Sequence, residues 1–179
     1  MRGVAADEIL VGPRVLLRAP RVEDADELFA SVTSDQKVTE YLSWTPHPDV
    51  NETRRVIREL FNVGDNHTWL IALRESGEVV GQLGYRRLEG HTAEIGYCMA
   101  VRWWGGGLMP EAVSVALQRL QQDPRLRRVT AAVHVDNVRS ARVLEKCGFT
   151  LEGRLTRHTV FPNLHPEPLD CLLYVRAIR

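Results

Sequence analysis

The sequence predicts one domain of the α/β (α+β) class, and three observations support this prediction. The chain has 179 residues, a usual length for a single domain, and 44% of them are hydrophobic, which is ample for a core. Segments in which apolar residues recur at helical spacing are interspersed with segments of extended character. In the second half, one predicted helix lies between two predicted strands, as in a crossover connection within a sheet.

The first half of the chain predicts four strands and two helices. A strand over RVLLR ends before Pro20, and a cluster of acidic residues then opens a helix, because acids are favoured at the positive end of the helix dipole. A second helix follows, and beyond it the spacing becomes extended, with the turn ESGE joining two antiparallel strands. In order, the predicted elements are a strand at 14–18, helices at 23–32 and 51–62, and strands at 67–74, 79–88 and 92–101.

The second half predicts three further strands and two helices. The first helix carries Met109, Val113, Ala116 and Leu120 on one stripe, at the spacing of an amphipathic helix. The predicted elements are a helix at 107–121, a strand at 128–135, a helix at 138–147, and strands at 149–160 and 169–177. The whole chain is therefore expected to form about seven strands and about four helices.

Composition and charge exclude several classes of protein. Basic and acidic residues both number 23, and a net charge of zero argues against a nucleic-acid binder that relies on bulk basicity. The three cysteines, Cys98, Cys147 and Cys171, are widely spaced without a CxxC pair, so neither a disulfide framework nor a metal site is expected. No segment approaches the ~18 apolar residues of a membrane span, and the acidic start, with Asp7 and Glu8, is unlike a signal peptide. We therefore expect a cytoplasmic protein that binds neither nucleic acid nor a membrane.

The most informative segment is a glycine-rich turn between a predicted strand and a predicted helix. It reads RWWGGGLMPEA, from Arg102 to Ala112. Glycines there let backbone N–H groups curl toward an anion at the positive end of a helix dipole, which suits a pyrophosphate. A tight turn without a ligand is the alternative. A P-loop is excluded because Leu108 and Met109 replace its Lys and Ser/Thr, and a Rossmann fingerprint because Pro110 replaces its third glycine.

Three motifs in order along the chain are similar to those of one enzyme family. The turn fits the pattern Arg/Gln-x-x-Gly-x-Gly/Ala at Arg102, Gly105 and Gly107. AEIGY at 93–97 lies upstream, and DNVRSARVLEKCGF at 136–149, followed by Glu-Gly, lies downstream. Together they resemble the GNAT superfamily of N-acetyltransferases, in the branch of the RimJ/RimL acetyltransferases of ribosomal-protein N-termini. The resemblance spans about residues 12–178.

The resemblance implies the GNAT fold and transfer of an acetyl group from acetyl-coenzyme A (acetyl-CoA) to a primary amine. It implies one N-acetyltransferase domain over residues 1–179, with 1–11 as an N-terminal extension, and a mixed, mostly antiparallel twisted sheet. The central strands, 92–101 and 128–135, would splay apart, and pantetheine would pair with the open strand edge between them. The coenzyme ligands that it implies are Met99, Ala100, Val101, Arg102, Gly105, Gly106, Gly107, Leu108, Asn137 and Lys146.

Two of these implied ligands also have local explanations. Asn137 stands where a strand meets a helix and is a good helix N-cap, while the resemblance adds a contact between its amide and pantetheine. Lys146 shares a basic helix face with Arg139 and Arg142. Either the 3′-phosphate of the coenzyme or solvent would cover that face.

Glu94 is the candidate general base, acting through water. Its strand would flank the acetyl group, and alternation places its side chain on the face of Gly96, Cys98 and Ala100. An ion pair with a neighbouring arginine is the alternative reading of this glutamate. His134 is a second candidate base, or else a half-buried structural histidine.

The chain departs from the family pattern at two positions. Many relatives carry a tyrosine acid just after the short helix, where this chain has Phe149, so Ser140 becomes the substitute acid. Val133 replaces a cysteine that some RimL-type enzymes carry, so no cysteine-assisted scheme is expected. The oxyanion that develops on the carbonyl would receive a backbone N–H from strand 97–101.

The leading acceptor is a protein N-terminal α-amine. Its pKa near ~8 makes it easier to neutralise than a lysine, with a pKa near ~10.4. The alternatives are a small-molecule amine, such as an antibiotic, polyamine or amino-acid derivative, and a catalytically weak acyl-CoA-binding module. Acceptor recognition is expected from residues 44–47 and 157–168. Exposed strand edges are compatible with a homodimer.

Overall fold

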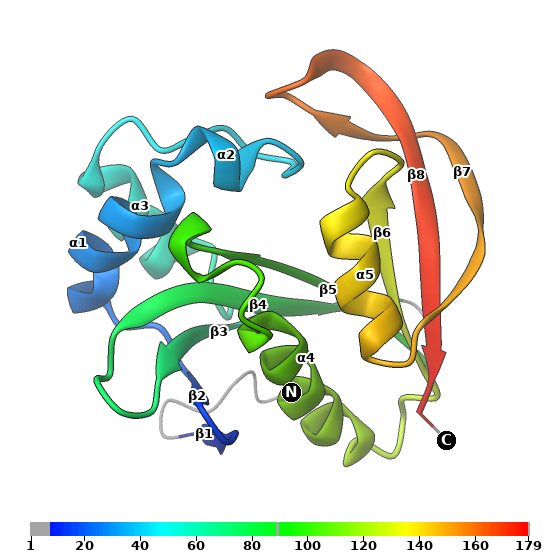
Figure 1. Ribbon diagram of the computed structural model, residues 1–179, viewed down its shortest axis with the longest axis horizontal. Helices are drawn as coiled ribbons and strands as arrows, with labels where there is room; N and C mark the ends of the chain where they lie inside the picture. The colour runs from blue at the N-terminus through cyan, green and yellow to red at the C-terminus, as the bar shows by residue number, and fades with distance from the viewer. Residues whose placement is uncertain (1–7, 89, 179) are drawn as a thin grey trace.

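A single twisted sheet forms the centre of the computed structural model, which describes residues 8–88 and 90–178 (Figure 1). Its strand order is β1-β2-β3-β4-β5-β6-β8-β7, with β5 and β6 parallel and the other neighbours antiparallel. The strands are β1 (Ile9–Val11), β2 (Val15–Arg18), β3 (Asn66–Leu73), β4 (Val79–Arg87), β5 (Thr92–Met99), β6 (Arg128–His134), β7 (Thr150–Phe161) and β8 (His165–Ala177). The predicted mixed, mostly antiparallel sheet is confirmed.

The N-terminal segment supplies the strand that the sequence did not predict. β1 pairs with β2 and adds an eighth strand to the expected seven. The proposed N-terminal extension at 1–11 therefore contributes to the sheet over Ile9–Val11, while its first seven residues lie outside the described part of the chain.

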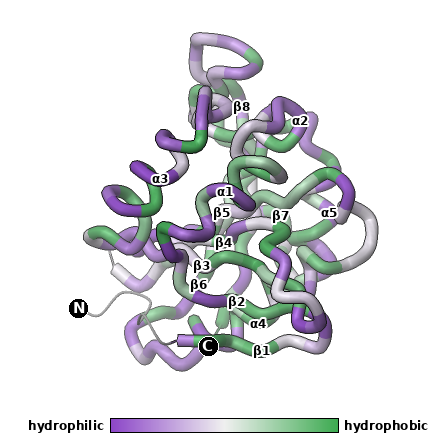
Figure 2. The backbone as a smooth tube through the Cα atoms, turned by 90° about the vertical axis from the view of Figure 1, so that its left-hand side faces the viewer, coloured by the Kyte–Doolittle hydropathy of each residue, from purple (hydrophilic) through white to green (hydrophobic). Residues whose placement is uncertain are grey.

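The helices of the described residues lie close to their predicted positions, except for a short helix at Gln36–Thr39 that the sequence did not predict. They are α1 (Ala25–Leu28), α2 (Gln36–Thr39), α3 (Val50–Glu59), α4 (Leu108–Gln121) and α5 (Val138–Lys146). The first predicted helix forms in pieces, because a 3₁₀ turn precedes α1 and a π turn follows it. Asp35 caps α2 and Asp49 caps α3 through their carboxylates, which explains where these two helices begin. α3 alternates hydrophilic and hydrophobic residues along its turns (Figure 2), and buries Thr53 and Ile57.

Two apolar clusters cover the two faces of the sheet. The larger contains the apolar side of α4 together with Leu144 of α5, packed on inward residues such as Val15, Trp69 and Ile95. The smaller joins α1 and α3 to Leu70 and Cys98 on the opposite face. Because side chains alternate along a strand, successive residues of β5 belong to different clusters.

β5 and β6 diverge in the middle of the sheet. Their pairing in the described sheet covers Thr92 with Arg128, Ala93 with Val129, and Glu94 with Thr130. β5 continues to Met99 along β4 while β6 follows β8, so the predicted splay of the central strands is confirmed. The divergence leaves one edge of β5 open beyond Glu94.

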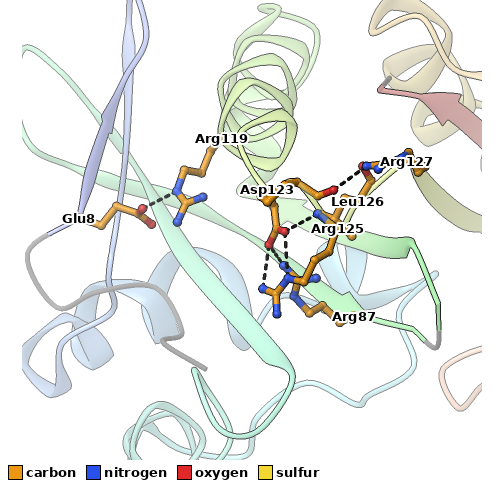
Figure 3. Close-up of polar contacts among 8 residues, drawn as sticks. Glu8, Arg87, Arg119, Asp123, Arg125, Leu126 and Arg127 are labelled. Atoms are coloured by element: carbon orange, nitrogen blue, oxygen red, sulfur yellow. Dashed lines mark hydrogen bonds and ion pairs between the residues drawn. The ribbon is translucent and has the colours of Figure 1, made fainter.

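The C-terminal end of α4 is held by ion pairs (Figure 3). Arg119 Nε lies 2.6 Å from Glu8 Oε1, and Asp123 pairs with Arg87 and, at 3.1 Å, with Arg125. A 14-residue helix is about 20 Å long, so these contacts lie far from the glycine-rich turn at its other end. They anchor the helix that presents the turn.

Candidate active site

A cavity of about 840 Å³ opens where β5 and β6 diverge. Its walls come from the end of β5, the glycine-rich turn, the start of α4, α5 and the region of α2. The predicted coenzyme ligands that line it are Met99, Gly105, Gly107, Leu108, Asn137 and Lys146. The other predicted ligands, which do not line it, are Ala100, Val101, Arg102 and Gly106.

The glycine-rich turn has the backbone that an anion cradle needs. Gly105 and Gly107 have φ values of 80° and 79°, in the left-handed region that favours glycine. A Cβ at Gly105 would meet nothing within 4 Å, so the space beside it is open. No described side chain caps α4 at Gly107, so the first amides of the helix remain for a ligand. Pro110 costs no helical hydrogen bond because it stands in the first turn.

A brace from β2 holds this turn in place. The carboxylate of Glu111 accepts hydrogen bonds from the backbone N–H of Arg14 at 2.6 Å and of Val15 at 3.1 Å, and from Arg14 Nε at 2.9 Å. Arg14 Nη1 in turn donates to the carbonyl of Gly106 at 3.0 Å. Burial opposes ionisation of Glu111, but the hydrogen bonds from Arg14 outweigh it and lower the pKa of the carboxyl.

Arg102 points elsewhere. Its guanidinium pairs with Glu78 in the turn between β3 and β4 and lies 5.9 Å from the ring of Trp103. The motif arginine therefore contacts its own scaffold, and a role for it in holding the pyrophosphate stays a prediction.

The two tryptophans before the glycines line the cavity, although sequence reasoning assigned them no role. Trp104 Nε1 donates to the carbonyl of Met99 at 2.7 Å, at the open edge of β5, and the guanidinium of Arg139 lies 4.8 Å from the Trp104 ring. The predicted basic face of α5 is thus tied to the turn by a cation–π contact. An aromatic pair directly before three glycines was the available signal.

The start of α5 brings Asn137, Ser140 and Tyr97 together. Asn137 Oδ1 accepts from the backbone N–H of Ser140 at 3.1 Å, so the predicted N-cap is confirmed. Ser140 Oγ lies 3.0 Å from the hydroxyl of Tyr97 on β5. Sequence reasoning quoted Tyr97 within AEIGY but gave it no function, since its contact depends on where α5 meets β5.

A second cavity, of about 1150 Å³, lies on the face of the sheet that α1 and α3 cover. It meets the first at Tyr41, Leu42, Tyr97 and Cys98, which line both. The residues of the expected recognition segments that line it are Trp44, Thr45, Pro46, His47, His158, Thr159 and Phe161. The two segments therefore line the same cavity.

Glu94 lines this second cavity, on the predicted face with Gly96 and Cys98. Its carboxylate accepts a hydrogen bond from Arg86 Nη2 at 3.1 Å, and its side chain is 31% exposed. Glu94 thus forms the ion pair with Arg86 and also lines the cavity. Burial raises the pKa of the nearby Cys98 thiol to about 12, so that thiol is a poor nucleophile.

His134 is held as a structural residue. It is 7% exposed, stacks on Tyr41 with 5.2 Å between ring centroids, and meets Phe161 edge-on at 5.1 Å. Its Nδ1 accepts from the backbone N–H of Asp136 at 3.2 Å. These contacts account for His134 as a structural residue, and a role as base stays a prediction for both His134 and Glu94.

The tip of the β7–β8 hairpin is fastened to the segment after α2. Asn163 Nδ2 donates to the carbonyls of Thr39 at 2.7 Å and Trp44 at 2.8 Å. In Figure 1 the tip leans over α2. One amide group thus joins the two segments that line the second cavity.

Comparison with known proteins agrees with this geometry. A family model described as an acetyltransferase (GNAT) domain matches residues 14–150. The chain is 34% identical over 153 residues to the uncharacterized N-acetyltransferase p20 of Bacillus licheniformis, covering 83% of this chain and 85% of p20. The chain belongs to the GNAT superfamily of N-acetyltransferases.

Two further proteins are also similar to this chain. The chain is 35% identical over 63 residues to the ribosomal protein uS5-alanine N-acetyltransferase of Escherichia coli. This match covers 35% of this chain and 32% of the relative. The fold of this chain matches the solved structure of Mycobacterium smegmatis RimJ in complex with CoA-disulfide, with a TM-score of 0.84 and 26% identity, covering 99% of this chain and 90% of RimJ.

The chain is therefore an acetyltransferase that uses acetyl-CoA, and the cavity at the splay fits this donor. The open space at Gly105 and the uncapped start of α4 suit the pyrophosphate, and Arg139, Arg142 and Lys146 line the cavity with positive charge. Among the described residues, no cluster of His, Cys, Asp and Glu could hold a metal ion. No helix in the described ranges has both the length and the apolar character needed to cross a membrane.

Proposed function

We propose that this enzyme acetylates the N-terminal α-amine of a protein or peptide. The observation that carries the proposal is the second cavity, which at about 1150 Å³ exceeds the ~300–1,000 Å³ of usual small-molecule sites and opens onto the thioester cavity. A site of that size accommodates several residues of an extended chain. The similarity to the uS5-alanine N-acetyltransferase supports the same acceptor class.

In the proposed reaction, Glu94 removes a proton from the amine through water. It lies three residues before Tyr97 on β5, or about 10 Å along the strand, so direct contact with an amine at the junction of the cavities is not expected. The neutral amine attacks the thioester carbonyl, and backbone N–H groups of the strand from Tyr97 onward stabilise the oxyanion. Ser140, which lines the first cavity, donates to the departing sulfur.

The acceptor is tested with a panel of peptides and small amines, read by release of free CoA thiol. We expect peptides with a free N-terminus to react, and the same peptides with a blocked N-terminus not to react. Turnover of small amines with none on any peptide would contradict the proposed acceptor. CoA binding without turnover on any amine would instead favour the acyl-CoA-binding alternative.

Glu94→Gln tests the base. It should lower kcat by a factor of about 10²–10⁴ while leaving the affinity for CoA unchanged. Glu52→Gln is the matched control, because Glu52 lines the same cavity and is also paired with an arginine, Arg55, at 2.7 Å. Equal losses in the two variants would remove Glu94 from the mechanism.

A further inference from the structure

Tyr97 is a half-buried tyrosine placed between the two halves of the site. It lies on β5 on the opposite face from Glu94, packs against the larger core cluster and lines both cavities. Its hydroxyl lies 3.0 Å from Ser140 Oγ and 3.2 Å from the Ser140 carbonyl oxygen. Tyr97 belongs to the AEIGY motif, but neither the resemblance nor the proposed mechanism gives its hydroxyl a role.

We propose that Tyr97 is a positioning residue for catalysis, which donates its phenolic hydrogen to Ser140 Oγ and so directs the serine hydroxyl hydrogen at the departing sulfur. This inference rests on the proposed role of Ser140. A serine hydroxyl has one hydrogen to donate and two lone pairs. When Tyr97 occupies a lone pair, that hydrogen is free for the cavity.

The surroundings support this direction of the hydrogen bond. Burial raises the pKa of the Tyr97 phenol, and the thiol of Cys147 raises it further, against the opposing effect of Ser140. The phenol therefore keeps its single hydrogen. Two oxygens of Ser140 compete for it, the carbonyl oxygen at 3.2 Å, which can only accept, and Oγ at 3.0 Å, and we assign it to the closer Oγ. Asn137 Oδ1 binds the backbone N–H of Ser140, so it leaves the serine hydroxyl to Tyr97.

Tyr97 and Ser140 together supply the hydrogen-bond donor for the departing sulfur, which the residue after α5 does not supply. Phe149, which follows that helix, is 3% exposed and has no hydroxyl. Tyr97 reaches the same helix from the sheet, at its first turn. Two hydroxyls in series also polarise one another, which strengthens the terminal donor.

The C–N bond forms, the C–S bond breaks, and the electron pair of that bond goes to sulfur, where the Ser140 hydroxyl stabilises it by a hydrogen bond. The proton of the amine leaves through Glu94 to water, and the released thiolate takes a proton from water. Tyr97 and Ser140 end the cycle as they began it.

Other charged groups act on the same cavity, and a test has to hold them constant. They come from α2 and the residues after it, and from α5 and the residues before it. They are Lys37, Glu40, Asp136, Arg139, Arg142 and Lys146. Tyr97→Phe leaves all of them in place and keeps the aromatic ring that packs in the core.

The first measurement is steady-state kinetics of Tyr97→Phe. We expect kcat to fall about tenfold, the factor that one ordinary hydrogen bond gives, with the KM for acetyl-CoA unchanged. Tyr174→Phe is the matched control, because the Tyr174 hydroxyl also donates to α5, to Glu145 at 3.0 Å, outside the cavity. A loss of the same size in both variants would overturn the proposal.

The second measurement needs no acceptor. The thiol of CoA bound to the enzyme is titrated by the ultraviolet absorbance of its thiolate. Tyr97→Phe and Ser140→Ala should both raise the pKa of the bound thiol, and Tyr174→Phe should leave it unchanged. An unchanged pKa in Tyr97→Phe would contradict the inference even if the acceptor class proposed above is correct, and a raised pKa would support it even if that class is wrong.

The double variant separates positioning from an independent effect. If Tyr97 acts through Ser140, adding Tyr97→Phe to Ser140→Ala should cost little further kcat. Losses that multiply across the two changes would show that Tyr97 acts by another route.

Discussion

At the scale of single residues, the backbone of the glycine-rich turn determines how the donor is bound. Gly107 has a φ of 79°, and a Cβ there would lie 3.4 Å from Arg14 Nη2, which belongs to the brace from β2. Alanine in the left-handed region costs about 1–2 kcal/mol. The strain arises at the position that starts α4.

In Gly107→Ala the unliganded turn should relax out of the left-handed conformation, and binding then has to restore it. The substitution should therefore weaken binding of CoA by about 5–30-fold, measured by calorimetry. Gly77→Ala is the matched control: Gly77 has a φ of 77° in the turn between β3 and β4, with nothing within 4 Å of its Cβ position. Gly77→Ala introduces the same backbone strain at a position outside the site. It should lower the unfolding temperature without changing affinity, and an equal loss of affinity in both variants would refute the assignment.

The pair of Arg18 and Asp24 gives the fold an acid-sensitive contact. The guanidinium of Arg18 donates to both carboxylate oxygens of Asp24, at 2.8 and 2.7 Å. Burial alone would raise the pKa of Asp24, but hydrogen bonds from Arg18 and from the backbone of Arg21 outweigh it and lower the pKa. A carboxyl whose pKa is lowered on folding stabilises the protein above its unfolded value of ~3.9 and loses that effect as pH falls through the folded pKa.

Asp24→Asn should accordingly cost about 2 kcal/mol of unfolding free energy at neutral pH and progressively less below about pH 4. Urea denaturation at several pH values measures the difference. Asp26→Asn is the control, because Asp26 pairs with Arg54 with a side chain that is 71% exposed, and exposed pairs contribute little. A gap between Asp24→Asn and the wild type that stays constant with pH would contradict this expectation.

The sequence predicted those features of the site that depend on a residue's own backbone conformation and near neighbours. The turn glycines and the cap at Asn137 follow from backbone conformation, and alternation along a strand correctly placed Glu94. The orientation of Arg102 and the contact of Tyr97 were not accessible, because their partners are 24 and 43 residues away on other elements. Such pairings depend on tertiary packing.

At the scale of elements, the hairpin of β7 and β8 differs most from expectation. The sequence predicts strands at 149–160 and 169–177, but β7 continues to Phe161 and β8 begins at His165, so most of the expected recognition segment 157–168 belongs to the sheet. Irregular register between β7 and β8 around Thr159 bends the hairpin. The sequence could not show this, because three prolines in seven residues predict poor strand formation.

Asn163 at the tip of this hairpin should influence the acceptor and not the donor. Asn163→Asp places a carboxylate against the carbonyls of Thr39 and Trp44, where the amide now donates. We expect the KM for the acceptor to rise about tenfold, since one good hydrogen-bonded contact is lost, with the KM for acetyl-CoA unchanged. Hydrogen exchange of residues 39–44 should accelerate. Asn163→Ala should show a smaller effect of the same kind, and an equal rise in both KM values would contradict the assignment.

At the scale of the whole molecule, the donor should stabilise the fold. CoA at a concentration of 100 Kd adds about 2.7 kcal/mol, which for a chain of this size raises the unfolding temperature by roughly 5–10 °C. Pantetheine, which lacks the pyrophosphate, should give a much smaller shift at the same concentration. Equal shifts in differential scanning fluorimetry would mean that the turn between β5 and α4 does not bind the pyrophosphate.

The short parallel pairing of β5 and β6 has a consequence for the life of the protein in solution. Beyond Glu94, the edge of β5 that faces away from β4 has no neighbouring strand in the described sheet, and the indole of Trp104 covers it at the Met99 carbonyl. Bare strand edges invite self-association. We expect concentrated enzyme to aggregate faster when stripped of coenzyme than when saturated with it, so that the supply of a metabolite would also govern how long the enzyme stays dispersed.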